Sequence, residues 1–186
     1  MLMIDKSWTL FLDRDGVINV ENPDGYINHW KEFVFYPEAK EAITMLSPLM
    51  YKTIVITNQR GVGRGITQLE NLHEIHKNLS EAIEDNGGKI DKIYFCPNVE
   101  NSSPNRKPNP GMALTARQEF PCIDFSKSIM IGNNVSDMEF GRNINIGCNI
   151  FLTTTQSLNS IPSHLYDHHF ISLYAAAIFI KDCVKK

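Results

Sequence analysis

The stretch "FLDRDGVIN", residues 11–19, decides how this chain folds. It ends an apolar run, WTLFLD at residues 8–13, whose length and composition predict a buried strand. Two acids, Asp13 and Asp15, then flank Arg14 at the point where this strand would end. The pair is either an acidic loop in solvent or two carboxylates that hold a cation and carry out chemistry. The rest of the sequence has to separate these two interpretations.

Strand-like and helix-like runs alternate along the chain, which predicts a parallel α/β architecture. We expect strands at residues 8–13, 52–57, 90–95, 127–131, 148–152 and 169–171. The positions at which we expect helices to begin are Pro37, the capping box of Thr67 and Glu70, Pro110 and Ser172. The long helix after Thr67 should end at Gly87–Gly88. On that helix we expect His73 and His76 to lie at the surface.

Two segments interrupt the alternation. Residues 20–35 are rich in turns and aromatic side chains and predict a hairpin-like flap. Residues 97–110 contain four prolines and no apolar period, which predicts a loop insertion of the kind that is usually functional or disordered. We expect a single domain over residues 1–186, with the motifs at the strand ends converging on one crevice.

Composition restricts the possible partners. The net charge of −3 offers no basic surface for nucleic acid or for an anionic membrane, and we expect neither partner. The four cysteines are far apart, which is typical of reduced thiols in the cytoplasm. We also expect no signal peptide, because the first residues lack a basic region followed by an apolar one. We therefore expect a cytoplasmic protein, and we expect it to be a monomer.

One chemistry available to the acid pair is phosphoryl transfer. A carboxylate such as Asp13 can attack a phosphoryl group, and a nearby acid such as Asp15 can protonate the leaving oxygen. Magnesium suits such a site, because it binds through few carboxylates together with water and phosphate oxygens. Taken alone, this motif leaves the solvated loop equally open.

Three further motifs could serve the same crevice. Thr57 and Asn58 end a predicted strand and could bind a phosphate or begin a helix. Arg106 and Lys107 could neutralise phosphate charge or lie exposed in a polar loop. Asp137 could bring a metal-binding carboxylate or cap a helix. Each motif is ambiguous alone, so their combination has to decide.

In order and spacing, these motifs resemble the haloacid dehalogenase-like phosphohydrolases. The matching stretches are FLDRDGVIN, DGYIN, TNQRGVGRG, CPN…RKPNPGM and IGNNVSDMEFG, which run from about residue 9 to residue 152. The most similar branch contains the histidinol-phosphate phosphatases and the D-glycero-D-manno-heptose-1,7-bisphosphate phosphatases. The resemblance implies a Rossmann-like parallel sheet flanked by helices, with a minimal cap. It also implies a Mg²⁺-dependent phosphomonoesterase that hydrolyses a small phosphate ester, a sugar phosphate or histidinol phosphate, through an aspartyl-phosphate.

The same resemblance implies a role for each matching residue. Asp13 would be the nucleophile and Asp15 the general acid/base. The phosphoryl group would be bound, and its charge stabilised, by Thr57, Asn58 and Lys107. The positions implied to contact substrate are Gly25, Tyr26, Asn58, Gln59 and Arg106. The positions implied or available to bind magnesium are Asp13, Asp15 through its carbonyl, Asn133 and Asp137.

The chain departs from the heptose bisphosphate branch in its zinc loop. That branch supplies zinc ligands as C-P-H and, later, as C-x-C before R-K-P. Here Cys96 remains, but the other three positions are Asn98, Ser103 and Asn105. Because one thiolate cannot make a four-coordinate structural site, we predict that zinc is absent.

A second departure affects magnesium. The family usually has Gly-Asp after the fourth strand, and here the aspartate position is Asn133. Asparagine can ligate through its amide oxygen but brings no charge, and Asp137, one helical turn on, could compensate by reorienting. Three outcomes are open: an active enzyme with weaker metal affinity, a slow enzyme, or a protein that only binds a phosphate ligand. We favour activity, because the nucleophile, the acid/base, the threonine and the lysine are all present.

Two other points stay open in the sequence. Polynucleotide 3′-phosphatase activity is an alternative within the fold, although the acidic net charge counts against it. Arg60 replaces a residue that is commonly small in the family. It could select a substrate with a second phosphate or carboxylate, but we expect it to point to solvent.

Overall fold

The computed structural model describes residues 2–184, and these fold around one six-stranded sheet. The strands are β1 (Thr9–Leu12), β2 (Lys52–Asn58), β3 (Lys92–Cys96), β4 (Ser128–Gly132), β5 (Cys148–Leu152) and β6 (His168–Phe170). Their order is β3-β2-β1-β4-β5-β6, and every neighbouring pair is parallel. This is the doubly wound order of Rossmann-like folds, so the predicted fold class is confirmed.

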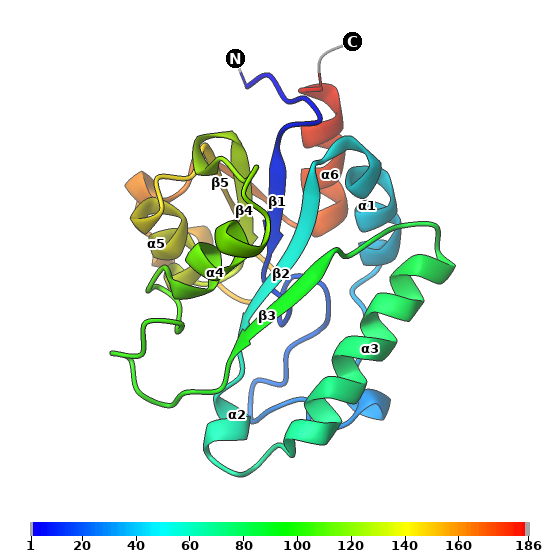
Figure 1. The fold of residues 1–186 in the computed structure, drawn as a ribbon, viewed down its shortest axis with the longest axis vertical. Helices are drawn as coiled ribbons and strands as arrows, with labels where there is room; N and C mark the ends of the chain where they lie inside the picture. Colours follow the sequence, from blue (N-terminus) through cyan, green and yellow to red (C-terminus); the bar gives the residue numbers. More distant parts are fainter. Residues whose placement is uncertain (1, 185–186) are drawn as a thin grey trace.

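Helices cover both faces of the sheet (Figure 1). They are α1 (Ala39–Leu46), α2 (Arg60–Gly63), α3 (Leu69–Asp85), α4 (Gly111–Glu119), α5 (Val135–Asn143) and α6 (Leu173–Asp182). Short 3₁₀ turns lie at Trp30–Glu32, Ser47–Leu49, Phe125–Lys127, Leu158–Ser160 and Ser163–Leu165. Helices α1, α3 and α6 lie on one side of the sheet, and α4 and α5 lie on the other.

Two apolar cores result from the alternation of side chains along the central strands. Leu10 and Leu12 of β1 pack with α1, α3 and α6, whereas Phe11 packs with α4 and α5. All three side chains have no solvent exposure. The β1 strand is therefore buried on both faces, as the continuous apolar run before Asp13 predicts.

The helix ends agree with the sequence in part. Ser172 caps α6, since its Oγ accepts the N–H of Ala175 at 3.1 Å. The end of α3 is also confirmed: Gly87 has φ +82° and donates its N–H to Glu84 O at 2.8 Å. The predicted capping box is wrong, because Gln68 is the N-cap and the buried Thr67 Oγ1 donates to Asn28 Oδ1 at 2.7 Å. Thr67 therefore ties the start of α3 to residues 20–35.

Residues 20–35 fold back on the loop that follows β1. Val20 donates its N–H to Val34 O at 2.8 Å, and Asn19 and Phe35 form an antiparallel bridge. The rings of Trp30 and Phe33 stack at 4.9 Å and anchor the segment. This anchored segment, which we call the flap, starts directly beside the carboxyl end of β1.

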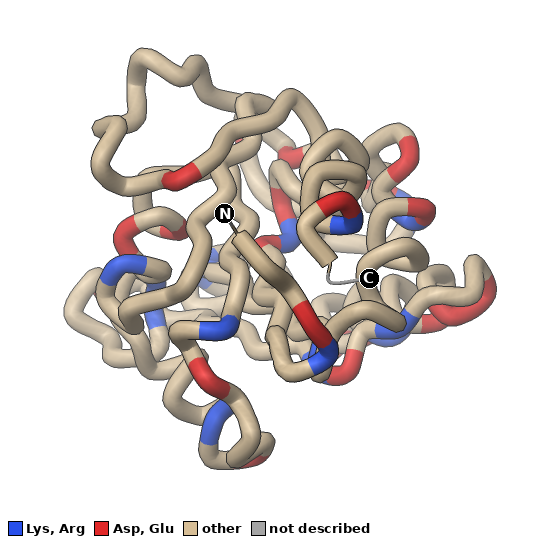
Figure 2. Tube along the Cα trace, turned by 90° about the horizontal axis from the view of Figure 1, so that it is seen from above, with Lys and Arg blue, Asp and Glu red and all other residues tan. Residues whose placement is uncertain are grey.

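The strands all run toward one edge, at the bottom of Figure 1, where α2, the flap and residues 97–110 gather. Both described ends of the chain lie at the opposite edge. Figure 2, viewed from that opposite edge, shows acidic and basic positions interspersed along the trace. Among residues 2–184, no helix has the length and hydropathy needed to cross a bilayer.

Candidate active site

The D-R-D-G turn leaves β1 beside β4, where the order of the strands reverses. Asp13 donates its N–H to Ile131 O at 3.0 Å, which extends the pairing of β1 with β4 by one residue. Gly16 then adopts φ +81°, and a β-carbon there would collide with the amide of Asn133. Glycine is required at this position, because the turn after β1 and the turn after β4 approach so closely.

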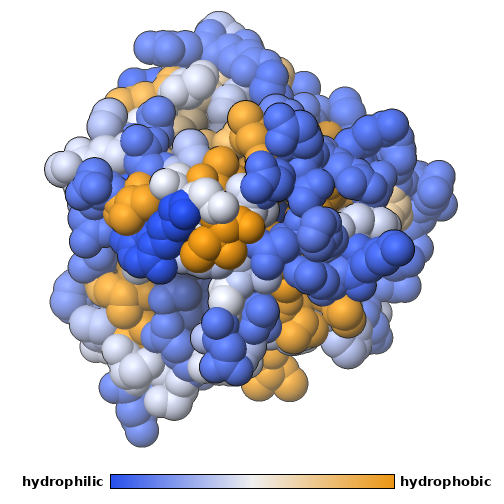
Figure 3. All heavy atoms as spheres, turned by 90° about the horizontal axis from the view of Figure 1, so that it is seen from below, coloured by the Kyte–Doolittle hydropathy of each residue, from blue (hydrophilic) through white to orange (hydrophobic). Residues whose placement is uncertain are grey.

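A cavity of about 260 Å³ opens at this point. Its lining comes from the ends of β1, β2 and β4, from the flap, from the start of α5 and from residues 97–110. The lining residues are Asp13, Asp15, Glu21, Thr57, Asn58, Arg106, Lys107, Asn134, Ser136 and Asp137. The structure thus brings together the four motifs that the sequence singled out. Figure 3 looks onto this edge of the sheet, whose surface is mostly hydrophilic with apolar atoms in separate groups.

Other expected site residues lie beside or behind this cavity. Gly25, Tyr26 and Gln59 line an adjoining space of about 120 Å³, together with Asp15, Glu21, Asn22, Ile27 and Asn58. Asn133 is fully buried behind the main cavity and does not line it. The substrate-contact positions are therefore continuous with the acid pair, and Asn133 can act on the site only from beneath.

Lys107 is buried between two carboxylates. Its Nζ lies 2.8 Å from Asp13 Oδ1 and 2.6 Å from Asp137 Oδ1, and it donates to Ile56 O at 2.9 Å. Burial opposes the charge of Lys107, but the two aspartates outweigh it and raise the pKa of the ammonium above its usual value. The lysine is therefore a permanent cation in contact with the expected nucleophile.

Asn58 holds this lysine in place. Lys107 donates its backbone N–H to Asn58 Oδ1 at 3.0 Å, and Asn58 Nδ2 donates to Lys107 O at 3.1 Å. Both polar atoms of the amide are thus used by the backbone of the loop insertion. The end of β2 and residues 97–110 are joined by this reciprocal pair, although they are about fifty residues apart.

Asp13 titrates near neutrality in this environment. Burial and then the charge of Asp137 raise the pKa of Asp13 from 3.8 to about 7, while Lys107 acts in the opposite direction. A cation placed against this carboxylate would displace its proton. The site is therefore suited to binding metal with release of a proton.

Asp15 is held in the opposite state. Its carboxylate accepts from Arg14 Nη2 at 2.9 Å, from Asn19 Nδ2 at 2.9 Å and from Gln59 Nε2 at 2.8 Å. Burial alone would raise the pKa of Asp15, but the charge of Arg14 and these hydrogen bonds hold it below its usual value. Asp15 is thus ionised, which is the form that a general base needs, and the two aspartates have divergent pKa values.

Arg14 and His76 support this arrangement and were not recognised in the sequence. Arg14 is fully buried, and its Nη1 lies 3.2 Å from His76 Nε2. Burial and then the charge of Arg14 lower the pKa of His76 to about 3, so the ring is neutral and accepts from the guanidinium. The prediction of a surface position for His76 is wrong. The sequence feature that indicates burial of His76 is its position beside Leu72, Ile75 and Leu79 on the apolar face of α3.

Asp137 has an extensive set of partners. Its Oδ2 accepts the backbone N–H groups of Asn133 at 3.1 Å and of Asn134 at 3.0 Å, while its Oδ1 contacts Lys107. The carboxylate thus holds the turn between β4 and α5 and fixes the lysine. Serving as a metal ligand, as we expected, would require it to leave these partners.

The buried amide of Asn133 has an oxygen that could hold a cation. Its Nδ2 donates to Thr155 Oγ1 at 2.7 Å, but its Oδ1 accepts no hydrogen bond from the described residues. A buried acceptor without a donor is uncommon and is suited to a cation. Among residues 2–184 no cluster of three or more His, Cys, Asp or Glu side chains is arranged to hold a metal. The candidate ligands are therefore the Asp13 carboxylate, the Asp15 carbonyl and the Asn133 amide.

Hydrogen bonds organise the loop insertion around the position of the expected zinc loop. Cys96 Sγ lies 3.6 Å from Asn98 Oδ1 and 3.8 Å from Ser103 Oγ. Asn109 Nδ2 donates to Asn101 O and to Ser103 O, each at 2.9 Å. Neutral side chains thus meet where the resemblance implies zinc ligands, and they hold Arg106 and Lys107 at the mouth and base of the cavity.

Three arginines cluster near the mouth of the cavity. Arg60 Nη2 and Arg106 Nε both donate to Asn101 Oδ1, at 2.9 and 3.3 Å, and Arg64 Nη1 donates to Tyr26 Oη at 2.9 Å. Burial and then the charge of Arg60 lower the pKa of Arg106. Arg60 is half-buried against the loop rather than directed to solvent as we expected.

The pKa of Asp13 leads to a prediction for the metal-free protein. Because the folded state holds a proton on Asp13 up to about pH 7 and the unfolded state loses it near pH 4, this group's contribution to the free energy of unfolding falls as pH rises between these values. We expect wild type to lose on the order of 2 kcal/mol relative to Asp13→Asn between pH 5 and pH 7.5. Urea denaturation in chelator measures both proteins. A difference that does not change with pH would show that Asp13 titrates normally.

Comparisons with known proteins agree with this geometry. The profile of the family described as "Polynucleotide kinase 3 phosphatase" matches residues 9–167. A D-glycero-beta-D-manno-heptose-1,7-bisphosphate 7-phosphatase from Photorhabdus laumondii is 33% identical over 159 residues, which cover 81% of this chain and 83% of that protein. The protein of that name from Helicobacter pylori is 37% identical over 153 residues, covering 81% and 86%.

A solved structure agrees with the fold. The D,D-heptose 1.7-bisphosphate phosphatase from B. bronchiseptica, complexed with magnesium and phosphate, superposes with a TM-score of 0.84 at 24% identity. The superposition covers 94% of this chain and 98% of that chain. The chain therefore belongs to the polynucleotide kinase 3 phosphatase family of haloacid dehalogenase-like phosphatases, which hydrolyse phosphoric monoesters.

Proposed function

We propose that this protein is a Mg²⁺-dependent phosphatase that hydrolyses a sugar bisphosphate through an aspartyl-phosphate on Asp13. The observation that carries the proposal is the contact of Asp13 with the buried cation Lys107, in a cavity that Asp15 and Thr57 also line. We further propose that it acts in the cytoplasm, since its separated cysteines are typical of reduced thiols, and that it acts as a monomer.

Catalysis requires two displacements at phosphorus. In the first, a carboxylate oxygen of Asp13 bonds to phosphorus, the ester P–O bond breaks, and Asp15 delivers a proton to the leaving oxygen. In the second, water attacks the same phosphorus, its proton passes to Asp15, and the Asp13–phosphate bond breaks to release phosphate. Lys107 offsets the negative charge of the phosphoryl oxygens throughout.

Asp15 has to change its protonation state within this cycle. The free site favours its carboxylate, because Arg14, Asn19 and Gln59 all donate to it. An incoming phosphate ester brings negative charge, which raises the proton affinity of nearby carboxylates. Gln59 also donates to Thr57 Oγ1 at 3.0 Å, so it links the acid/base to the phosphate-binding threonine.

The donor set of the site supports magnesium. We propose that the Asp13 carboxylate, the Asp15 carbonyl and the Asn133 Oδ1 hold the ion, while Asp137 remains a support of Lys107. These are hard oxygen donors with few charges, the set that Mg²⁺ prefers when phosphate and water complete its shell. When bound, Mg²⁺ supplies a Lewis acid that neutralises phosphate charge and orients the group for in-line attack.

The space beside Asp15 supports a polyhydroxylated leaving group. It is lined by amide, hydroxyl and carboxyl groups of Asn22, Tyr26, Gln59 and Glu21. Amides and carboxylates offer the acceptors and donors that sugar hydroxyls require. The names of the relatives from Photorhabdus laumondii and Helicobacter pylori point to the same class of substrate.

The arginines at the mouth support a second anionic group on the substrate. Within the described part of the chain, Arg60, Arg64 and Arg106 form no ion pair with Asp or Glu. Arg60 and Arg106 instead share one neutral amide oxygen, which a phosphate would outcompete. We therefore propose that a second phosphate binds there.

Arg60→Gln is expected to raise KM about tenfold for a sugar bisphosphate, because one charge-assisted hydrogen bond is lost. KM for the matching monophosphate should change less than twofold. Steady-state phosphate release measures both, and Arg117→Gln, which removes an exposed guanidinium on α4, is the control. An equal rise for both substrates would place Arg60 at the reacting phosphate or in the fold.

The proposed function is tested by phosphate release from a panel of sugar mono- and bisphosphates, histidinol phosphate and a 3′-phosphorylated oligonucleotide. We expect release from a sugar bisphosphate with Mg²⁺ and none in chelator. Release only from the oligonucleotide would establish the polynucleotide 3′-phosphatase alternative. No release from any ester, together with tight phosphate binding, would establish a binding protein.

A further inference from the structure

The site contains a fourth carboxylate, beside Asp13, Asp15 and Asp137, that none of the sequence motifs singled out. Glu21 starts the flap, is half-buried, and lines the cavity that contains Asp13 as well as the adjoining space beside Tyr26. Within residues 2–184 it forms no ion pair. It therefore presents an uncompensated negative charge to the cavity.

Glu21 contacts Asn133, the uncharged residue at the position where the family usually has an aspartate. Its Oε2 lies 3.4 Å from Asn133 Nδ2, and the same amide group donates to Thr155 Oγ1 at 2.7 Å. With Nδ2 held by these two acceptors, the buried Oδ1 is left without a donor. The side-chain amide of Asn133 packs against Gly16, the residue directly after Asp15. Its unpaired oxygen therefore lies close to the turn that carries Asp13 and Asp15.

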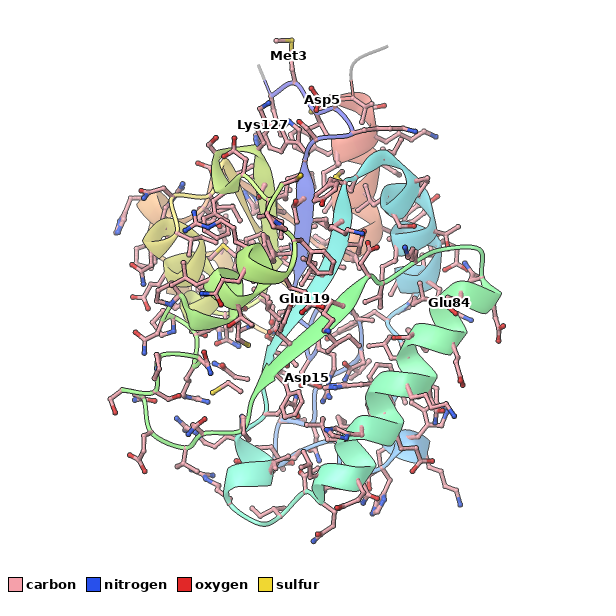
Figure 4. The ribbon with its side chains drawn as sticks, viewed as in Figure 1. Met3, Asp5, Asp15, Glu84, Glu119 and Lys127 are labelled. Atoms are coloured by element: carbon pink, nitrogen blue, oxygen red, sulfur yellow. The ribbon has the colours of Figure 1, made fainter. Side chains whose placement is uncertain are left out.

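The groups around the cavity carry a net negative charge for a cation only when Glu21 is counted. Lys107 offsets one of its two aspartates, Asp13 and Asp137, and leaves one negative charge. Arg14 offsets Asp15 at 2.9 Å. Arg106, which lines the same cavity, brings the sum to zero. Glu21 then brings it to one negative unit, whereas Asn133 contributes none. Figure 4 shows Asp15 in the lower half of the molecule, toward the carboxyl edge where these groups meet.

Asp137 is not available for this task. Both of its oxygens are used, one by two backbone N–H groups and the other by Lys107. Turning it toward a metal would leave the backbone N–H groups of Asn133 and Asn134 without their acceptor and would take one of two carboxylates from the buried Lys107. Glu21 would lose only one long hydrogen bond to Asn133.

We propose that Glu21 supplies the negative charge that Asn133 lacks, so that the Glu21–Asn133 pair forms one acidic component of the divalent-cation site. The amide oxygen of Asn133 would hold the ion, and Glu21 would bring the charge through its contact with Asn133 Nδ2. This inference rests on the proposed magnesium dependence. It also makes residues 21 and 133 interchangeable: one carboxylate is needed, and either position can carry it.

The test is calorimetric titration of the metal-free proteins with Mg²⁺ alone, without substrate. Glu21→Gln is expected to weaken Mg²⁺ binding about tenfold or more, the scale of losses at groups that support metal ligands. The double variant Glu21→Gln/Asn133→Asp should regain the affinity of wild type. Asp24→Asn removes an exposed charge from the same flap and should bind as wild type does.

Each outcome is decisive. If Glu21→Gln binds Mg²⁺ as tightly as wild type, or if Asn133→Asp does not rescue it, the inference is wrong while the proposed function stands. If wild type itself binds no Mg²⁺, the proposed function fails first. Asn133→Asp with Glu21 intact gives a second measurement of the coupling. Its gain in affinity should be smaller than the gain in the Glu21→Gln background, and equal gains would refute the coupling.

Discussion

Asp13→Asn is expected to lower Mg²⁺-dependent phosphate release by on the order of 10⁴-fold or more, the scale produced by losing the nucleophile of a hydrolase. The amide keeps the size of the carboxyl group but cannot form the ester bond to phosphorus. The effect should appear in kcat, because Thr57, Lys107 and Arg106 still line the cavity and can bind substrate. Steady-state release and acid-quenched mass spectrometry measure the two consequences, turnover and the phosphorylated enzyme.

The variant should remain folded, and this makes its inactivity interpretable. Lys107 keeps Asp137 as its partner at 2.6 Å, so the buried ammonium is not left alone. Above pH 7, removal of one of two neighbouring buried acids should even stabilise the metal-free protein. Asp24→Asn, exposed on the flap, is the control for a neutralised aspartate. Equal activity of Asp13→Asn and wild type would show that another group attacks phosphorus.

The fold could be predicted because the motifs mark strand ends. Each apolar run of the sequence ends in polar residues, and parallel strands deliver those ends to one edge. The convergence of Asp13, Thr57, Lys107 and Asp137 follows from that topology. The register and order of the sheet then place Asp13 beside β4, where its N–H meets Ile131 O.

The sequence failed where a side chain has a tertiary partner. Thr67 has the local pattern of a capping residue, but the flap carries Asn28 to its hydroxyl and takes it out of that role. His76 has a polar side chain on an apolar helix face, and only the fold brings Arg14 within 3.2 Å of it. The residue pattern within one helix cannot reveal a hydrogen-bond partner that lies more than sixty residues away in the sequence.

The metal question shows the same limit. Asn133 and Asp137 are close in sequence, so the sequence offered Asp137 as the compensating acid. In three dimensions the backbone of Asn133 and Asn134 occupies Asp137, and the flap brings Glu21 to the amide of Asn133. Glu21 and Asn133 are separated by 112 positions along the chain. A departure at one motif position is therefore interpretable only with its spatial neighbours known.

Lys107→Met is expected to lower the free energy of unfolding at pH 7.5 by about 3–5 kcal/mol, the typical cost of removing one partner from a buried ion pair. Methionine fills a similar volume, so the loss reflects charge rather than a cavity. Asp13 and Asp137 would be left buried without a cation, although Asp137 would keep its two backbone donors and Asp13 would keep the N–H of Arg14. Urea denaturation in chelator measures the loss, and Lys127→Met, at the edge of the molecule that carries the termini in Figure 4, is the control.

The pH dependence of this loss identifies its cause. Without Lys107 the pKa of Asp13 should rise further, because the cation that opposes burial and Asp137 is gone. The folded variant then holds its extra proton to higher pH, so its free energy of unfolding falls more steeply than that of wild type as pH rises from 5 to 7.5. Lys107→Met/Asp137→Asn, which removes one of the two acids, should recover part of the stability at pH 7.5 without recovering phosphate release. A loss of free energy of unfolding that is equal at pH 5 and pH 7.5, and that Asp137→Asn does not reduce, would mean that Lys107 stabilises the fold by packing. The charge of Lys107 would then act only on the phosphoryl group.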